Sequence, residues 1–283
     1  MKVIAPPILY KYYPVEDWLP RLMNGESMLF ASRTSFNDPY DSRSAFQVDQ
    51  SDVGTKWLLK KFRTEQPHWS PAKRMLKVNQ VQRRLKLPSI DRDDTELDSV
   101  GILCLTEHWN SMLMWSHYAK QHKGICVGFR RDIDIFRMAL KIEYVSEFPV
   151  ILRPQDDHNT ILQKALLMKA ECWKYETEWR VVKRPMSESE QIAIKQQNAY
   201  LPSKDLHLLT DSRGAGFYAF DKSAIESVTL GSRITERCVR DVIRSIDSAG
   251  LAIPIYVVEP PNHKYQLVRK DFQRGSMAFP IEI

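Results

Sequence analysis

Short apolar runs bounded by turn residues recur along the chain and predict many β-strands. The run ILYKYYP (8–14) predicts a first strand that ends at Pro14, and SMLFASRTS (27–35) predicts the next. FNDPYD (36–41) predicts a turn in which Asn37 and Asp38 cap backbone groups, with contact to a substrate as the alternative. Further strands are predicted at residues 101–107, 125–129, 142–147, 174–182, 216–231, 253–259 and 265–270.

Apolar residues at helical spacing predict helices between these strands. A short helix follows Pro14 and stops at Asn24-Gly25, and a longer one begins at Thr235 and ends at Gly250. Because strands and helices mix without a regular βαβ rhythm, the sequence predicts a single α+β domain over residues 1–283 with a mixed or antiparallel sheet. Residues 54–98 would form a basic helical insertion. Other helices are predicted within residues 54–87, before Gly124 and at 159–172, and a loop or surface helix at 186–198.

The stretch KYETEWRVV (174–182) combines a strand pattern with two acidic residues. Trp179 and Val181 have the character of core residues, whereas Glu176, Glu178 and Arg180 occupy the other parity. Side chains alternate between the faces of a strand, so both carboxylates and the guanidinium are expected to project the same way. Two carboxylates this close repel each other unless a cation or a substrate group lies between them.

The composition is that of an ordinary globular protein, with 43% apolar and 27% charged residues among 283. No apolar run is long enough for a transmembrane helix, and the N-terminal MKVIAPPILYKYYP lacks the features of a signal peptide. The four cysteines lie far apart and form no CxxC pair, which indicates reduced thiols. We therefore expect a cytoplasmic protein without membrane contact. No metal site is expected either, because the histidines and carboxylates have no known ligand spacing.

Positive charge is concentrated in one segment. Residues 56–87 contain ten Lys or Arg and the single acid Glu65, a local balance of +9 that exceeds the +6 of the whole chain. A block of one sign suggests a polyanionic partner such as RNA or DNA, although an exposed basic helix pair is the structural alternative. Trp57, Phe62 and Trp69 would offer stacking surfaces or belong to the core. The candidate phosphate-binding residues are Lys73, Arg74, Lys77, Arg83 and Arg84.

Five motifs occur in an order that resembles a bacterial family catalogued as a domain of unknown function. They are LYKYYP, LFASRTSFNDPYD, MWSHYAKQHKGICVGF, KAECWKYETEWRVV and IESVTLGSRI, and the resemblance spans roughly residues 8–268. The chain also resembles mono-ADP-ribosyltransferases in its order of elements: a first strand with tyrosines, a helix ending in Asn-Gly, a Ser/Thr strand and a Glu-x-Glu strand. That resemblance implies a split sheet with NAD in the cleft.

The resemblance to the transferases also implies residue roles. Glu178 would stabilise the oxocarbenium-like centre formed when nicotinamide leaves ribose, and Glu176 would position or activate the acceptor. Lys169 and Arg180 would neutralise the two glutamates if the acids have a structural role instead. His117 is equally well explained as a base, a substrate ligand or a structural residue, and Arg180 is also a candidate substrate ligand. The residues that would hold NAD are Ser32 and Thr34 at the ribose, one of Tyr10, Tyr118 or Trp115 at the nicotinamide, and Lys11, in place of the usual Arg or His, at the pyrophosphate.

These observations together predict an NAD-dependent mono-ADP-ribosyltransferase that modifies a nucleic acid, with RNA favoured over DNA. By analogy with the family, it would be a toxin-like effector, for example in antiphage defence, and would require a neutralising antitoxin protein. Two alternatives stay open: a nucleic-acid-binding module without enzymatic activity, and an NAD hydrolase without a macromolecular acceptor.

Overall fold

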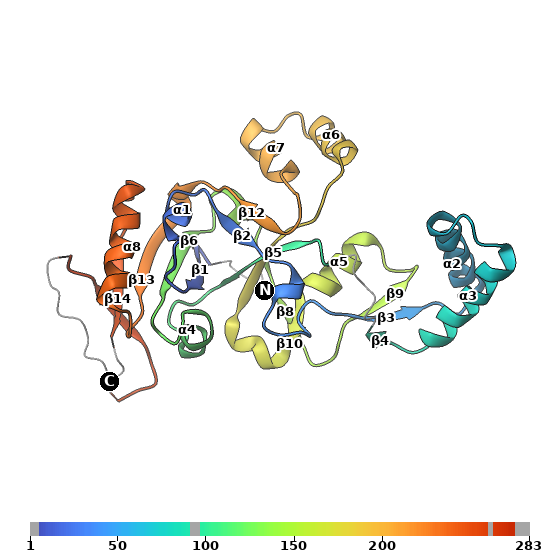
Figure 1. The fold of residues 1–283 in the computed structure, drawn as a ribbon, viewed down its shortest axis with the longest axis horizontal. Helices are drawn as coiled ribbons and strands as arrows, with labels where there is room; N and C mark the ends of the chain where they lie inside the picture. The colour runs from blue at the N-terminus through green and yellow to red at the C-terminus, as the bar shows by residue number, and fades with distance from the viewer. Residues whose placement is uncertain (1–5, 91–96, 260–262, 275–283) are drawn as a thin grey trace. The chain divides into compact units, whose positions relative to one another are not determined.

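Helices and strands follow each other irregularly, which gives the chain an α+β fold (Figure 1). The computed structural model describes residues 6–90, 97–259 and 263–274. Contacts divide the chain into two compact units. The first unit contains Met1–Ser35, Ser99–Lys141 and Lys174–Ile283, and the second contains Phe36–Asp98 and Ile142–Trp173. The predicted α+β class is confirmed, while the predicted single domain stays a prediction.

An eight-stranded mixed sheet forms the centre of the first unit, in the order β15-β14-β13-β6-β1-β5-β11-β7. All neighbouring pairs in it are antiparallel except β13 and β14. A separate antiparallel pair is formed by β2 (Met28–Phe30) and β12 (Gly216–Tyr218). The strands of the large sheet are β1 (Ile8–Tyr13), β5 (Gly101–Thr106), β6 (Ile125–Arg130), β7 (Leu140–Lys141), β11 (Glu178–Lys183), β13 (Ile225–Leu230), β14 (Ile255–Glu259) and β15 (Val268–Asp271).

The two faces of this sheet have separate apolar clusters, as side-chain alternation requires. One cluster contains Leu9, Val127 and Trp179, and packs against α1 (Leu19–Met23) and α8 (Glu236–Ser248). Thr235 begins α8 as predicted, because its side chain accepts a hydrogen bond from the main-chain nitrogen of Cys238. The second cluster contains Tyr10, Tyr12 and Cys126 with Trp115 of α4 (Met112–Tyr118).

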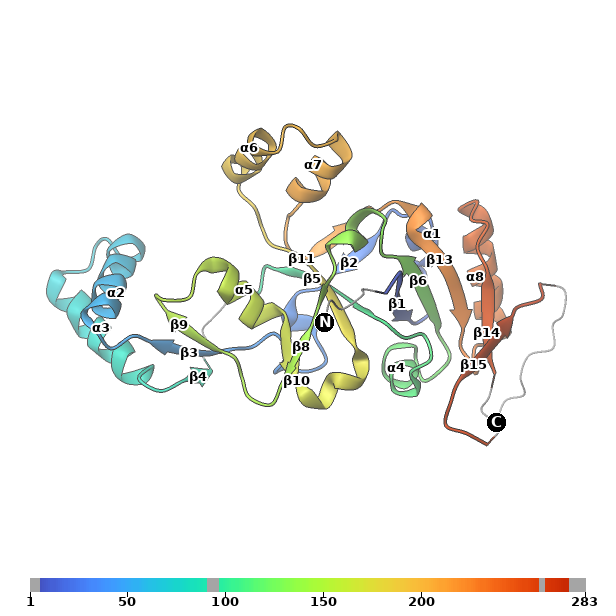
Figure 2. The same ribbon diagram turned by 180° about the vertical axis from the view of Figure 1, so that it is seen from behind.

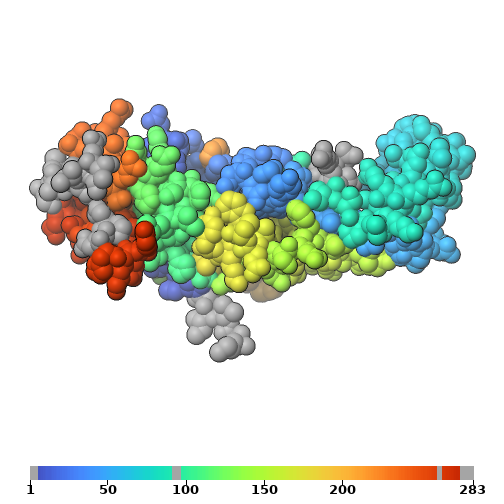
Figure 3. Space-filling model, turned by 90° about the horizontal axis from the view of Figure 1, so that it is seen from below, coloured from blue at the N-terminus to red at the C-terminus, as the bar shows by residue number. Residues whose placement is uncertain are grey.

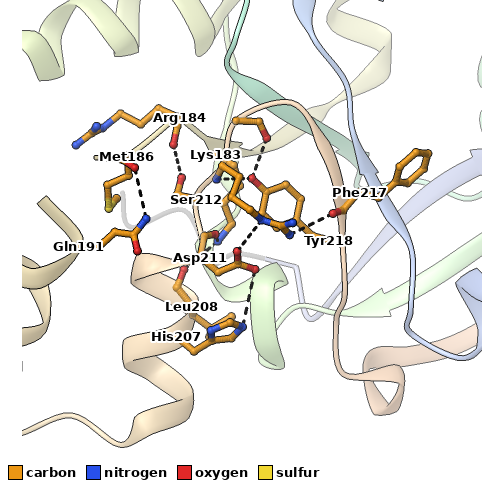
Figure 4. A network of polar contacts seen from close by, with 12 residues as sticks. Lys183, Arg184, Met186, Gln191, His207, Leu208, Asp211, Ser212, Phe217 and Tyr218 are labelled. Carbon is orange, nitrogen blue, oxygen red and sulfur yellow. Dashed lines mark hydrogen bonds and ion pairs between the residues drawn. The ribbon is translucent and has the colours of Figure 1, made fainter. Parts of the chain in front are cut away.

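A buried lysine at the end of β11 holds one of the two helices that follow this strand. α6 (Glu188–Gln197) and α7 (Ser203–Thr210) lie between β11 and β12. The ammonium group of Lys183 donates to the main-chain oxygens of Leu208 and Asp211 at 2.9 and 2.7 Å (Figure 4). These carbonyls lie at the C-terminal end of α7, where oxygens lack helical partners and a cation is favourable. Burial lowers the pKa of Lys183, and the negative charge of Asp211 opposes that change.

The second unit carries the basic segment as a helical hairpin of α2 (Asp52–Glu65) and α3 (Pro71–Arg84) (Figure 2). Ser51 and Ser70 cap the two helices by accepting hydrogen bonds from main-chain nitrogens. The rest of the unit consists of the three-stranded sheet β4-β3-β9, the parallel pair β10-β8 and α5. Their bounds are β3 (Ala45–Val48), β4 (Ser89–Ile90), β8 (Glu143–Val145), β9 (Val150–Arg153), α5 (His158–Leu166) and β10 (Met168–Ala170).

Several predicted elements are wrong in extent. The strand predicted at 27–35 ends at Phe30 and continues as a 3-10 turn at Arg33–Ser35. The helix predicted at 159–172 ends at Leu166, and the strand predicted from residue 174 begins at Glu178, because a 3-10 segment occupies Glu171–Glu176. α7, β3 and β9 have no matching prediction. Part of the predicted insertion at 54–98 lies outside the described residues. In the part of the chain that the structure describes, no helix is long and apolar enough to cross a membrane.

Trp115 allows a direct test of the second cluster. Its side chain is fully buried, its ring nitrogen donates to the oxygen of Trp109 at 2.7 Å, and its ring meets Tyr12 edge to face. We expect Trp115→Ala to lower the free energy of unfolding by about 3–5 kcal/mol, because neighbouring side chains cannot fill the cavity left by such a large side chain. Urea unfolding measures this, with Trp115→Phe as the milder control. Near-equal stability of the alanine variant and the wild type would show that this cluster is loosely packed.

Candidate active site around Glu178

Glu178 is the first residue of β11, which lies between β5 and the edge strand β7 of the large sheet. It pairs with Thr106 on β5, and Thr106 pairs in turn with Tyr10 on β1. Directly paired residues project from the same face of a sheet, so these three side chains form a row across adjacent strands. Glu178 and Thr106 are buried, and Tyr10 is nearly so.

The carboxylate of Glu178 is held by both arms of one guanidinium. Arg180 Nε donates to Oε1 at 2.7 Å and its Nη2 donates to Oε2 at 3.2 Å. The two residues are separated by one position, which confirms that alternation places them on one face. Their side chains are only 4% and 0% exposed. A bidentate pair of this kind fixes the carboxylate in its ionised form and in one orientation. The structural alternative, an ion pair between Glu178 and Arg180, is therefore confirmed as a contact.

Glu176 does not share the strand with Glu178, which corrects the predicted alternation. It ends the 3-10 segment, and the next residue, Thr177, has a φ of +43°. This left-handed conformation is rare for a β-branched residue and breaks the regular parity. Tyr175 consequently belongs to the Tyr10 cluster, while Trp179 belongs to the opposite one. Glu176 is buried, and its Oε1 accepts a hydrogen bond from Tyr118 at 2.8 Å.

Thr106 holds the kink between the two glutamates in place and was not identified from the sequence. Its hydroxyl donates to the main-chain oxygen of Glu176 at 2.6 Å and lies 3.3 Å from the hydroxyl of Thr177. A strained backbone of this kind costs of order 1–3 kcal/mol and persists only where its surroundings enforce it. Such residues cluster at functional sites, which makes the kink at Thr177 a second observation in favour of a site here. A threonine at the end of a buried strand gives no signal of this role in the sequence.

Lys11 of β1, the residue expected at the NAD pyrophosphate, contacts the backbone of the neighbouring strand β5. Its ammonium group donates to the main-chain oxygen of Cys104 on β5 at 3.0 Å and lies over the ring of Tyr13. Burial lowers the pKa of Lys11, and the negative charge of Glu178 opposes that change. Lys11 is thus a partly buried cation between two strands.

Ser32 and Thr34 lie outside the row of residues around Glu178, which corrects their predicted place on a strand beside it. Thr34 belongs to the 3-10 turn Arg33–Ser35 and Ser32 directly precedes that turn, with their hydroxyls 2.9 Å apart. The preceding residue, Ala31, pairs with Ile102, four positions along β5 from Thr106. At about 3.3 Å per residue this is a separation of roughly 13 Å.

The aromatic residues expected to contact NAD differ in their burial and in their neighbours. Trp115 is fully buried in the second cluster, so its predicted stacking on nicotinamide is wrong. Tyr10 packs in the same cluster, and burial raises its pKa. Tyr118 is half-buried beside Glu176, and His117 is exposed and meets the ring of Tyr118 edge to face. Within residues 6–90, 97–259 and 263–274, no three His, Cys, Asp or Glu side chains are grouped as a metal would require.

The basic residues of the hairpin do not form one surface. On α3, Lys73, Lys77 and Arg84 recur at helical spacing and share a face, while Arg83 projects from another. Arg74 is half-buried and donates to the oxygen of Pro67 at 2.7 Å, which indicates a structural role. On α2, a second exposed face carries Lys56, Lys60 and Arg63. Figure 3 shows the segment that contains the hairpin in space-filling form.

The aromatic residues of the hairpin are half-buried and contact one another or lysine side chains. The rings of Phe62 and Trp69 are 5.8 Å apart, and Lys73 lies over Trp69. Lys61 lies over Trp57. These rings are half-buried and contact the connection between the helices or lysine side chains, so both sequence interpretations apply to them in part.

Comparison with known families supports the resemblance to a domain of unknown function. Residues 114–181 match the model of DUF2971, a protein family of unknown function. The matched segment includes Glu176, Glu178 and Arg180, and it excludes Lys11 and the basic hairpin. Searches against curated proteins and against solved structures gave no match.

The buried ion pair predicts a strong coupling between Glu178 and Arg180. We expect Arg180→Met to lower the free energy of unfolding by about 3–5 kcal/mol, because it removes the bidentate partner of a buried carboxylate. The double variant with Glu178→Gln should lose less than the sum of the single losses, as urea unfolding of all four proteins will measure. A matched control is the exposed pair of Lys270 and Glu259, 2.8 Å apart, where Lys270→Met should cost at most about 1 kcal/mol. Additive losses for Glu178 and Arg180 would contradict the coupling.

Proposed function

We propose that this chain is an NAD-dependent mono-ADP-ribosyltransferase with a split-sheet fold that modifies a nucleic acid, with RNA favoured over DNA. The observation that carries the proposal is the ionised carboxylate of Glu178, buried and fixed in one orientation by Arg180. Cleavage of the nicotinamide–ribose bond creates positive charge at the sugar, and a carboxylate that is already oriented stabilises such charge without reorganising.

The reaction needs two tasks, and the two glutamates are placed to divide them. The bond between C1′ of the ribose and the nicotinamide nitrogen breaks, and nicotinamide leaves with the bonding electrons. A hydroxyl or amine of the acceptor then forms a new bond to C1′ and gives up its proton to a base. Glu178 faces the sugar, and Glu176, on the other side of the kink at Thr177, accepts the proton. Tyr118 orients Glu176 through its hydrogen bond.

Two features of the sheet are compatible with the split that the resemblance to the transferases implies. β1 and β5 share only one paired position, Tyr10 with Thr106, although each has six residues. Lys11 inserts its ammonium group toward the backbone of β5 beyond that position. Strands that meet at one end and separate at the other are the arrangement that the resemblance to the transferases implies.

The acceptor class is inferred from the second unit. Its hairpin carries two exposed basic faces, and such faces attract phosphates regardless of sequence. A nucleic acid is therefore a better match than an acidic protein loop. The toxin-like role and its neutralising partner belong to the same proposal. If the proposal holds, expression of the wild-type chain should arrest bacterial growth, and Glu178→Gln should relieve the arrest.

A second candidate function is a nucleic-acid-binding module without enzymatic activity. The observation in its favour is the same ion pair, because a carboxylate that is bonded to arginine is also a normal structural element. The two candidates differ in one measurement. The transferase consumes NAD, and the binding module does not.

The first prediction of the transferase proposal concerns NAD turnover. Glu178→Gln keeps the shape and part of the hydrogen bonding to Arg180 but removes the negative charge. We expect it to slow release of nicotinamide by about a hundredfold or more, equivalent to about 3 kcal/mol. Glu176→Gln should impair transfer to RNA more than cleavage of NAD. Radiolabelled NAD incubated with the protein and total RNA, DNA or protein measures both steps.

The control for this experiment is Glu259→Gln, a surface glutamate at the end of β14 in the same sheet. It should turn over NAD at the wild-type rate. Circular dichroism must show that each variant is folded, since the loss of a buried charge also lowers stability. A folded Glu178→Gln protein with normal turnover would refute the catalytic role, and a wild type without turnover would favour the binding module.

The second prediction concerns the salt dependence of binding to single-stranded RNA. If Lys73 and Lys77 contact phosphates, Lys73→Gln/Lys77→Gln should reduce the slope of log K against log salt by about 1.4, or roughly 0.7 for each contact. The variant Lys123→Gln/Lys195→Gln removes the same charge from exposed lysines outside the hairpin and should leave the slope nearly unchanged. Equal slopes for the two double variants would mean that only net charge matters.

A further inference from the structure

A pocket in the second unit is formed by the FNDPYD motif and is not used by the proposed chemistry. The loop 38–43, the connection between β8 and β9, and β10 enclose a hollow with an empty volume of about 430 Å³, including the part open to solvent. Asp38 forms the predicted turn by accepting a hydrogen bond from the main-chain nitrogen of Tyr40 at 2.8 Å. Ser42 in the same loop has a φ of +56°, which is unusual for a residue with a side chain.

Buried charged groups border this pocket. The ammonium group of Lys169 lies 3.1 Å from Asp41, and the two side chains are only 6% and 5% exposed. Trp173 holds Lys169 and the loop 38–43 in place. The ammonium group of Lys169 lies over its ring, and its ring nitrogen donates to Asp38 at 2.8 Å. The pocket therefore offers a cationic donor and carboxylate acceptors in set positions. A ligand with both donor and acceptor groups on one edge matches it.

Two aromatic rings line the same pocket and remain largely open to solvent. Tyr40 is 63% exposed and Phe148 is 40% exposed, and their ring centroids are 6.2 Å apart at 58°. Two adjacent exposed rings leave apolar surface uncovered, and such surface is available to a ligand. Rings in this position offer stacking surfaces to a planar group.

The surroundings of the pocket within the second unit indicate what carries the planar group. β3 runs directly from the pocket loop to α2, so the basic hairpin follows the pocket residues in sequence after one short strand. Ser51 lies eight positions after Arg43, which is at most about 26 Å of extended chain. Lys56 and Lys60 are exposed on the hairpin. Aromatic rings next to a basic surface are the combination with which proteins bind single-stranded nucleic acids.

We propose that this pocket holds one unpaired nucleobase, stacked on Tyr40 and Phe148, while the phosphates of the same strand contact the basic hairpin. Asp41 and Lys169 would meet the donor and acceptor groups on the edge of the base. The inference rests on the nucleic-acid acceptor of the proposed function but not on NAD chemistry. A free nucleotide presents the same base, and the experiment separates the two sources.

The test is binding of a short labelled single-stranded RNA, measured by fluorescence anisotropy without NAD. Tyr40→Ala and Phe148→Ala should each weaken binding by about tenfold, because loss of one base–aromatic stack costs about 1–3 kcal/mol. Tyr40→Phe keeps the ring and should bind as the wild type does. Tyr200→Ala, which removes an even more exposed tyrosine from the first unit, is the matched control and should have no effect. The salt dependence should not change in any of these variants.

A second readout reports stacking itself. In an RNA that carries 2-aminopurine, the wild-type protein should change the fluorescence of the analogue, and Tyr40→Ala should abolish that change. If mononucleotides bind the wild type through Tyr40 and single-stranded RNA does not, the base comes from a free nucleotide, and the proposed link to the hairpin is overturned. Wild-type affinity in both alanine variants, or no binding of either ligand, overturns the pocket assignment.

These outcomes are independent of NAD turnover. Base binding that depends on Tyr40 in a protein that does not consume NAD would leave this inference standing and refute the transferase. NAD turnover with unchanged RNA binding in the alanine variants would support the transferase and refute this inference.

Discussion

The bidentate ion pair between Glu178 and Arg180 is the constraint around which the first unit is organised. Removing two charges from water costs several kcal/mol for each ion, and only close geometry with further polar contacts compensates that cost. The register of β11 against β5 supplies the geometry, since it fixes both side chains on one face and leaves Trp179 for the opposite core. A shift of one residue would bury Trp179 among the charges and expose Glu178 to apolar side chains.

The same constraint explains why the sequence predicted one half of this strand and not the other. From Glu178 onward, alternation assigns every side chain to the correct face, because pairing with β5 enforces a regular ladder. Before Glu178, the kink at Thr177 and the 3-10 segment cancel the alternation. The kink depends on Thr106, a residue 71 positions away in sequence. Local patterns carry no information about such a partner, so the roles of Glu176 and Thr106 required the structure.

Charge and apolar periodicity predicted the basic hairpin more accurately than they predicted its surfaces. The helices and their positive charge follow from local sequence. The division of the charge between separate faces, and the structural use of Arg74, follow from packing between the helices. The pocket at the FNDPYD turn was recognisable only as a turn, because its other walls come from residues about 100 positions later. The predictions for Ser32 and Trp115 failed for a related reason. Both residues were assigned from the resemblance to the transferases, whereas packing determines where they lie.

The pairing of Glu178 with arginine also limits how the site can act on a cation. A guanidinium in contact neutralises much of the field of the carboxylate, so a positive sugar gains less from Glu178 than from an isolated acid. Two unit charges about 4 Å apart interact by about 4 kcal/mol at an effective dielectric constant near 20. Even a reduced attraction between the carboxylate and the sugar is therefore useful. The arginine contributes something else in return. It keeps a buried carboxylate charged and stationary, so in the proposed reaction no free energy would be spent on ionising or turning it as positive charge develops. Lysine could supply the charge at this position but not the two parallel hydrogen bonds, which is why the fork of Arg180 matters as much as its sign.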